Sequence, residues 1–226
     1  MQQAIKPAAA VLNEDYRKQL LTNEYQIILS PHEELADKIR QLRKTFAETY
    51  EAPAVQNGKP NLTLVRFTQL ALMEERIVQR LRTIAMGFCP FKVELKDFGS
   101  LPTHSIFINV TSKLPIRGLV KEVRDVQRLM KLDKEHKPHF IDEPNLLIAR
   151  SLSSAQYEKA WLEFSHKNFT GRFIADSMLL LRRRSNNGPS DGPHSRPRTG
   201  DKNWQIAERF TFQNLPVTTR QGELFG

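Results

Sequence analysis

One seven-residue pattern occurs twice in the chain and constrains its fold more than any other feature. The first copy is Pro-Asn-Leu-Thr-Leu-Val-Arg at residues 60–66, and the second is Pro-Asn-Leu-Leu-Ile-Ala-Arg at residues 144–150. Both copies enter an apolar run through Pro-Asn and leave it through Arg, and their starts lie 84 residues apart (144 − 60 = 84). Two apolar strands could match by chance, but the shared entry and exit residues favour a duplication. The repeat therefore predicts two similar halves, each with one such strand at the same structural position.

The segments around the two copies alternate between expected strands and expected helices. Before and after the first copy we expect strands at 25–29, 91–95 and 105–110 and helices at about 31–50 and 71–86. Around the second copy we expect helices at 115–132 and from 153 through 164, and strands at 173–181 and 204–212. Their order predicts a duplicated α+β fold.

Two of the expected helices carry capping signals. Ser30, Pro31 and Glu33 have the spacing of an N-cap, a first helical residue and the acid of a capping box. Ser153 and Gln156 form a second Ser-x-x-Gln pattern. Both signals predict where a helix begins.

The chain is expected to form an N-terminal arm at 1–23 and a single two-lobed domain at 24–226. Residues 24–112 and 113–184 should contribute mainly to one lobe each. Residues 185–203 are rich in Ser, Asn, Gly, Pro and Arg, which predicts a flexible loop before the last strand.

Composition limits the kinds of partner and cofactor. The formal charge of +9 favours polyanionic partners, nucleic acid first. The single cysteine, Cys89, excludes an internal disulfide and a cysteine metal cluster. The sequence shows no membrane span, no signal-peptide pattern, no metal-ligand spacing and no Gly-rich phosphate loop, so we expect a cytoplasmic protein without membrane, metal or cofactor.

The repeated strands place polar residues in pairs. In an extended segment, residues i and i+2 face the same side. Asn61 therefore points with Thr63, and Asn145 points with Leu147. If a pseudo-twofold axis relates the halves, both pairs converge on one groove.

At these residues the chain resembles the 2H phosphoesterases, which include bacterial 2′-5′ RNA ligase-like proteins and RNA cyclic phosphodiesterases. That family carries two His-x-Thr/Ser motifs at a similar separation, each on a strand entered through Pro-His, and the second typically ends in Arg. The resemblance covers roughly residues 25–181. It implies a two-lobed α+β fold with two small antiparallel sheets around a central cleft.

The chain departs from the family pattern at the residues that carry the chemistry. Asn61 and Asn145 stand where the family has histidines, and Leu147 stands where it has a second Thr or Ser. A histidine can exchange a proton near neutral pH, whereas a carboxamide cannot. The resemblance therefore implies no catalytic residue here, and a ligand site made of Asn61, Thr63, Asn145, Leu147 and Arg150, whose guanidinium can grip a phosphate.

Three functions are consistent with these residues. The first is a degenerate active site that binds a nucleotide or an RNA end, such as a 2′,3′-cyclic or 2′-phosphate end, without efficient turnover. The second is an active phosphodiesterase or RNA ligase-like enzyme with a rearranged site that uses His104 or His139. The third is a protein-interaction scaffold with a vestigial cleft. The basic run Arg182–Arg184 is either a solvated strand end or part of an RNA clamp. The sequence leaves the oligomeric state open.

Overall fold

Two antiparallel sheets organise the computed structural model, which describes residues 21–52, 58–185 and 203–216. The five-stranded sheet has the order β5 (His139–Phe140), β2 (Leu62–Leu70), β1 (Thr22–Leu29), β8 (Ser177–Arg184) and β9 (Gln205–Thr211). The four-stranded sheet has the order β6 (Asn145–Ala149), β4 (Ser105–Val110), β3 (Phe91–Leu101) and β7 (Thr170–Ala175). This α+β architecture confirms the predicted fold class.

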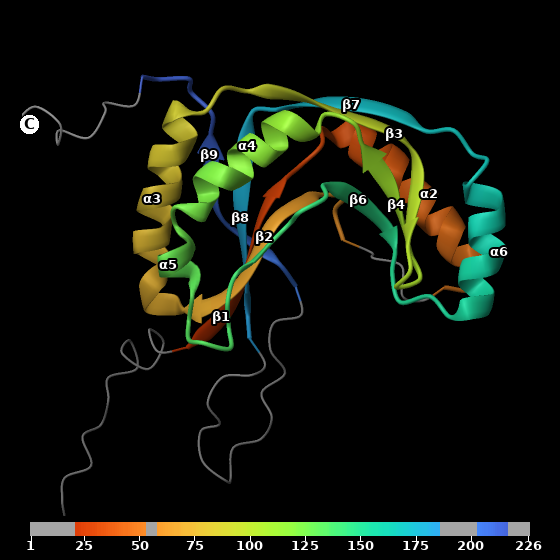
Figure 1. The fold of residues 1–226 in the computed structure, drawn as a ribbon, viewed down its shortest axis with the longest axis horizontal. Coiled ribbons are helices and arrows are strands. Elements are labelled where there is room, and N and C mark those ends of the chain that lie inside the picture. Colours follow the sequence, from red (N-terminus) through yellow and green to blue (C-terminus); the bar gives the residue numbers. More distant parts are fainter. Residues whose placement is uncertain (1–20, 53–57, 186–202, 217–226) are drawn as a thin grey trace, which may run out of the picture.

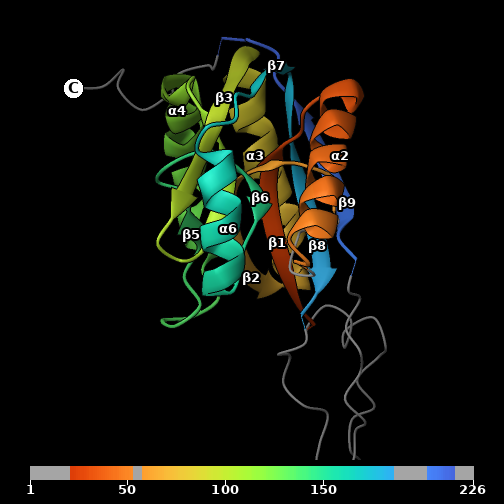
Figure 2. The same ribbon diagram turned by 90° about the vertical axis from the view of Figure 1, so that its right-hand side faces the viewer.

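The helices cover the outer sides of the two sheets. They are α2 (Glu33–Thr49), the short 3-10 helix η1 (Ala71–Met73), α3 (Glu74–Gly87), α4 (Lys113–Arg124), α5 (Gln127–Met130) and α6 (Ser154–Phe164). In Figure 1, α3, α4 and α5 lie with the five-stranded sheet on the left, and α2 and α6 lie with the four-stranded sheet on the right. Figure 2 shows the molecule from the side of α2 and α6. No helix in the described part of the chain is both long and apolar enough to span a membrane.

A strand and a helix precede each copy of the repeated strand. The first set is β1, α2 and β2, and the second is β4, α4 and β6, with α5 and β5 between α4 and β6. In both sets the first strand pairs with the repeated strand in antiparallel fashion. The four-stranded sheet joins β3 and β4 to β6 and β7, and β8 pairs with β1 in the five-stranded sheet. Each sheet therefore contains strands from both residues 24–112 and residues 113–184.

One hydrophobic core connects the two halves. Buried residues of the first half, such as Ile27 and Leu62, belong to the same apolar cluster as Leu146 and Ile148 of the second half. Aromatic contacts contribute to this cluster. The ring centroids of Phe46 on α2 and Phe164 on α6, for example, lie 5.2 Å apart. Phe67 and Phe173 are buried in it as well.

The two capping predictions have different outcomes. Ser153 accepts a hydrogen bond from the Gln156 backbone N–H and the Gln156 side chain accepts from the Ser153 backbone N–H, which confirms the second capping box. The prediction for Ser30 is wrong. Helix α2 begins at Glu33 after His32, with no side-chain cap, and the Ser30 hydroxyl lies 3.5 Å from the Pro31 carbonyl.

Several predicted elements differ from the observed ones. The predicted helix 115–132 divides into α4 and α5, with a turn at 125–126 between them. The predicted strand 173–181 is two strands, since the chain leaves the four-stranded sheet at Ala175 and enters the five-stranded sheet at Ser177. The last strand, β9, lies within the predicted range. The predicted loop lies outside the described residues except at its two ends, and the predicted arm does so for residues 1–20.

Arg43 connects helix α2 to both repeated segments. Its Nη1 donates to the Gly58 carbonyl at 3.1 Å, and its Nε donates to the Leu147 carbonyl at 3.2 Å. The side chain is buried, and this burial lowers the pKa of the guanidinium to about 10, so it stays charged at neutral pH. Arg43 thus holds the segment before β2 and the edge of β6 against the same helix.

We expect Arg43→Met to destabilise the protein. The substitution keeps much of the side-chain volume but leaves the carbonyls of Gly58 and Leu147 without this donor, which should lower the free energy of unfolding by about 2–4 kcal/mol. Urea unfolding measures the difference. Arg40→Met is the matched control on the same helix, because Arg40 forms exposed ion pairs with Glu33 and Asp37 within the described residues, and its loss should change stability little. Equal stability of the two variants would contradict the structural role of Arg43.

Candidate functional site

The two copies of the repeat have the same pattern of exposure. Residues 59–66 and 143–150 follow one order of exposed, half-buried and buried positions, residue by residue. In both copies the proline is buried, the asparagine is half-buried and the final arginine is exposed. The duplication seen in the sequence therefore extends to the environment of each side chain.

Each repeated strand contains a β-bulge at the equivalent residue. The register between β1 and β2 skips Leu64, and the register between β4 and β6 skips Ile148. These positions are 84 residues apart (148 − 64 = 84), the period of the repeat. Both bulged residues and the residues that follow them, Val65 and Ala149, are fully buried.

The bulge decides where the arginine points. The asparagine and the arginine of each copy are five positions apart, so regular alternation would place them on opposite faces of the strand. One extra residue between them restores the same face. Arg66 therefore shares a face with Asn61, and Arg150 shares a face with Asn145.

The two asparagines make the same local hydrogen bond. Asn61 Nδ2 donates to the Lys59 carbonyl at 3.1 Å, and Asn145 Nδ2 donates to the Glu143 carbonyl at 3.1 Å. The Thr63 hydroxyl also donates to Asn61 Oδ1 at 3.3 Å, an interaction that leucine at the equivalent position 147 cannot make. Both amides are therefore fixed relative to their strands.

The residue before each proline forms an ion pair with the start of a helix. In the first copy this residue is a lysine and its partner on the helix is a glutamate, and in the second copy the two residue types are reversed. Lys59 Nζ lies 2.8 Å from Glu33 Oε2 at the start of α2, and Lys113 Nζ, at the start of α4, lies 2.7 Å from Glu143 Oε2. Hydrogen bonds from these lysines hold the pKa of Glu33 and Glu143 below the usual range. The entry to each repeated strand is thus fixed in a similar way in both halves.

The repeated strands lie against each other at the centre of the molecule. β2 contacts β6, which is an edge strand of its own sheet, and the two strands run apart from this contact (Figure 1). Asn145 lines a cavity of about 680 Å³ together with residues of β3 and β4 that include Leu101, Phe107 and Asn109.

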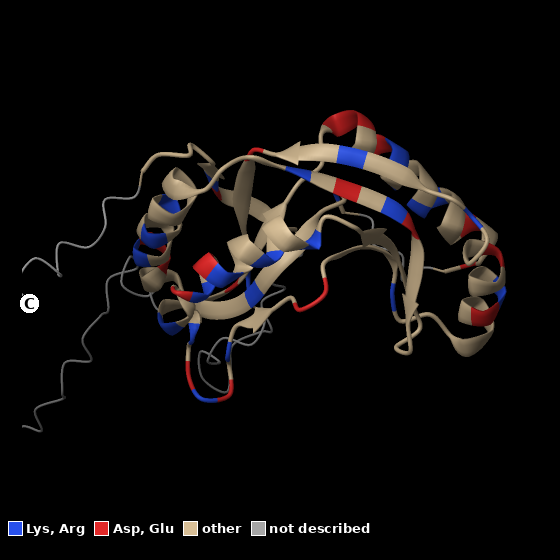
Figure 3. Cartoon of the chain, turned by 45° about the horizontal axis from the view of Figure 1, so that its top comes forward, with Lys and Arg blue, Asp and Glu red and all other residues tan. Residues whose placement is uncertain are grey.

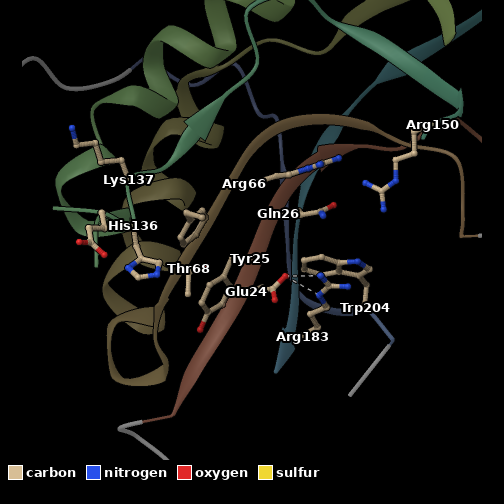
Figure 4. Close-up of a pocket in the computed structure, with 12 residues that line it drawn as sticks. Glu24, Tyr25, Gln26, Arg66, Thr68, His136, Lys137, Arg150, Arg183 and Trp204 are labelled. Atoms are coloured by element: carbon tan, nitrogen blue, oxygen red, sulfur yellow. Dashed lines mark hydrogen bonds and ion pairs between the residues drawn. The ribbon is translucent and has the colours of Figure 1, made fainter. Parts of the chain in front are cut away.

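A second cavity, of about 380 Å³, lies over the five-stranded sheet. Figure 4 shows side chains that line it from β1, β2 and β8, from the loop before β5 and from the segment before β9. Its polar lining residues include Glu24, Gln26, Arg66, His136, Lys137, Arg150 and Arg183, and Trp204 forms part of one wall.

The charges in this cavity are unevenly paired. Arg183 Nη2 lies 2.6 Å from Glu24 Oε2, and the Arg183 guanidinium lies 4.6 Å from the centre of the Trp204 ring. Neither Arg66 nor Arg150 has an ion pair or hydrogen bond from its side chain among the described residues. The pKa of Arg66 is lowered by partial loss of solvent and then by the charges of Arg150 and Arg183. Three guanidinium groups therefore repel one another around one cavity.

The predicted site residues are only partly brought together by these cavities. Asn145 lines the larger one and Arg150 lines the smaller one, whereas Asn61, Thr63 and Leu147 line neither. Convergence of the Asn61 and Asn145 side chains on one ligand stays a prediction. In the basic run, Arg182 pairs with Glu74 at 2.8 Å and Arg183 pairs with Glu24, so these two arginines are engaged within the fold.

The histidines lie in three different environments. His104 has a positive φ of 52°, and its ring stacks on Tyr157 with 5.0 Å between centroids. His139 faces Arg66 across the register of β5 and β2. His136 is exposed and lines the smaller cavity, and its Nδ1 lies 2.7 Å from Asp133 Oδ2.

Sequence reasoning missed several lining residues of the smaller cavity. Arg66 could have been found, because it is the repeat equivalent of Arg150. Arg183 belongs to the basic run that the sequence offered as part of an RNA clamp. Gln26 and Trp204 carry no such signal, since only the pairing of distant strands brings them to the cavity. Within the described ranges, no group of three or more His, Cys, Asp or Glu residues could hold a metal ion.

Comparisons with known proteins identify the family and the fold. The model of a family described as the 2′-5′ RNA ligase superfamily matches residues 31–187. Escherichia coli LigT complexed with 3′-AMP is 13% identical, with 85% of this chain and 98% of that chain covered and a TM-score of 0.54. A structure described as a phosphoesterase is 13% identical, with 84% and 98% covered and a TM-score of 0.59.

A third similar structure is TT0787 of Thermus thermophilus, which is 15% identical, with 84% of this chain and 98% of that chain covered and a TM-score of 0.53. At these identities the solved structures show a common fold. No curated protein sequence matches the chain.

The repulsion among the arginines gives a prediction about stability. Arg66→Gln should raise the free energy of unfolding without ligand, by at most about 0.5 kcal/mol after solvent screening, because it removes one of three like charges. Urea unfolding at low and high NaCl measures this, and the gain should shrink as salt increases. Arg80→Gln, which changes the same charge at an exposed position on α3, should show no such gain. A loss of stability in Arg66→Gln would mean that the guanidinium stabilises the fold.

Proposed function

The chain belongs to the 2′-5′ RNA ligase superfamily, whose members are 2H phosphoesterases, and from this premise we propose that it binds a nucleotide or an RNA-end phosphate without efficient turnover. The proposed ligand-binding residues are Asn61, Thr63, Asn145, Leu147 and Arg150. The ligand would lie where the two repeated strands meet.

The observation that carries this proposal is the matched pair of asparagines. Asn61 and Asn145 occupy the same position in both copies of the repeat and make the same hydrogen bond to the carbonyl two residues earlier. A carboxamide does not titrate near neutral pH, so it can neither take a proton from an attacking oxygen nor give one to a leaving oxygen. Each lost acid or base reduces the rate by roughly 10²–10⁴-fold.

The same residues remain suited to holding an anion. Each amide can donate hydrogen bonds, Thr63 adds a hydroxyl, and a guanidinium such as that of Arg150 can bind phosphate through two hydrogen bonds. Solved structures of Escherichia coli LigT, which shares the fold, contain 3′-AMP, ATP or NADP+. These complexes support a nucleotide as the class of ligand for this chain.

One observation favours a second function, an active enzyme with a rearranged site. Asp133 holds Nδ1 of His136 at 2.7 Å, and His136 lines a cavity that also contains Arg66 and Arg150. A histidine oriented by a carboxylate next to phosphate-binding arginines has the parts of a general acid or base. In this reading His136, instead of His104 or His139, carries the proton.

Turnover of 2′,3′-cyclic nucleotides tests the proposal. The unmodified protein should show no measurable hydrolysis and no 2′-5′ joining. The triple variant Asn61→His, Asn145→His and Leu147→Thr supplies two proton carriers and a hydroxyl, and it should recover part of the phosphodiesterase activity. Asn109→His is the matched control, because it adds a histidine to the cavity that Asn145 lines without changing the repeat.

Two other outcomes would change the assignment. Activity in the unmodified protein that His136→Gln abolishes would contradict the inactive site and establish the rearranged enzyme. Absence of thermal stabilisation by any nucleotide would contradict ligand binding and leave the scaffold function.

A further inference from the structure

The larger cavity, of about 680 Å³, is lined by residues of β3, β4 and β6 and has a chemistry different from that of the smaller one. We propose that it binds an uncharged planar ring that carries an amide group. The amide is either a carboxamide on an aromatic ring or the lactam of an unphosphorylated nucleoside. This inference goes beyond the proposed function, because it involves no phosphate and would hold for a protein that binds no nucleotide.

The register of the four-stranded sheet brings one aromatic ring and two carboxamides together. Asn109 on β4 lies opposite Asn145 on β6, and Phe107 on β4 lies opposite Gly99 on β3. Residues i and i+2 of a strand face the same side, as do residues directly opposite each other in an antiparallel pair. Phe107, Asn109 and Asn145 therefore line the cavity from one face of the sheet.

Gly99 makes room for two of these side chains. A Cβ atom at this position would lie 2.6 Å from Cε2 of Phe107 and 2.7 Å from Oδ1 of Asn109. Both side chains thus extend over the backbone of Gly99, into space that a side chain at position 99 would fill. A glycine inside a strand often marks a close approach of this kind. The absence of a side chain at position 99 therefore allows the ring and the amide to lie where they do.

The cavity offers an aromatic ring that has no aromatic partner. Phe107 is half-buried, and no other ring packs on it within the described residues. Leu101 lines the same cavity and is 43% exposed. Apolar and aromatic side chains with a few polar groups are the usual lining of a small-molecule site. A planar ligand can therefore gain a stacking contact with Phe107.

The carboxamides supply the polar contacts. The Asn109 side chain has no hydrogen-bond partner in the part of the chain that the structure describes. It offers an N–H donor and a C=O acceptor side by side, and Asn145 uses one N–H for the Glu143 carbonyl and keeps a second. An amide on the ligand can pair with such a group through two hydrogen bonds, one in each direction.

The charges at this cavity balance. Two cations (Lys96, Lys113) and two carboxylates (Asp97, Glu143) line it, so its formal charge is zero (2 − 2 = 0). The smaller cavity, with four cations and two carboxylates, has a formal charge of +2 (4 − 2 = 2). Over the molecule, Lys and Arg alternate with Asp and Glu on helices and strands (Figure 3). Because the two carboxylates offset the two cations, the larger cavity favours an uncharged ligand.

NMR titration of the whole protein with nicotinamide tests the site. We expect a Kd of about 1 mM, as for an efficient ligand of this size, with shift changes on β3, β4 and β6. Phe107→Leu keeps an apolar side chain but removes the planar ring, and Asn109→Leu keeps the volume but removes the amide. Each should weaken binding about fivefold, since each removes one contact. Phe91→Leu is the matched control and should leave the affinity unchanged, because Phe91 is also half-buried on β3 but does not line the cavity.

Two related probes test the charge and the ring separately. Nicotinate, which has a carboxylate in place of the amide, should bind at least about tenfold more weakly. Cyclohexanecarboxamide, which keeps the amide without a planar ring, should bind about fivefold more weakly. Equal affinity for nicotinate and nicotinamide would overturn the inference, and so would full nicotinamide affinity in Asn109→Leu. If Phe107→Leu does not fold, Asn109→Leu and the two probes still decide the outcome.

Uridine, which carries a lactam but no phosphate, distinguishes the two sources of the ring. Tighter binding of uridine than of nicotinamide, with the same loss in Asn109→Leu, assigns the cavity to a nucleoside, and the reverse order assigns it to a free aromatic carboxamide. Either result supports the site. No shift change with either compound at about 20 mM, well above the expected Kd, would overturn it. Absence of thermal stabilisation by nucleotides would refute the proposed function alone, because these probes carry no phosphate.

Discussion

The buried guanidinium of Arg43 is the interaction on which the arrangement of the two repeated strands depends. Its hydrogen bonds reach the Gly58 carbonyl before β2 and the Leu147 carbonyl in β6. β6 is an edge strand, and an edge exposes backbone groups that need partners. Arg43 provides such a partner from α2 and at the same time fixes the distance between the two strands. A ligand site built from both copies of the repeat would therefore use strands that this side chain helps to hold together.

The bulges bring both polar ends of each repeated strand to one face. Without them, each copy would present its asparagine to one face and its arginine to the other. With them, the apolar residues Leu64, Val65, Ile148 and Ala149 enter the core, and both polar ends of each copy share a face. The single extra residue in each strand thus allows two consecutive apolar residues to pack in the core. It also keeps the asparagine and the arginine, five positions apart, on the same polar face.

The sequence predicted the features that depend on local pattern. The repeat and the order of elements predicted the two-sheet α+β fold, and the Ser153 capping box predicted the start of α6. The assignment of Arg150 to a ligand site stays a prediction. The bulges could not be predicted, because a bulge exists only in the register between two strands. The step between the sheets at Asp176 was missed, although Asp176 and Ser177 interrupt the apolar run at this place. Arg183 and Trp204 meet only because β9 pairs with β8.

The proposed function, binding without efficient turnover, rests on the hydrogen bonds that the two asparagines can make. An amide nitrogen has two hydrogens, and in both copies one of them is directed to the carbonyl two residues earlier. The other remains a donor at every pH, whereas the donor capacity of a histidine changes with its protonation. A phosphate oxygen accepts hydrogen bonds and needs only such a donor. In the proposed function, a fixed donor at Asn61 and Asn145 therefore removes the acid–base step and keeps an interaction that can hold an anion.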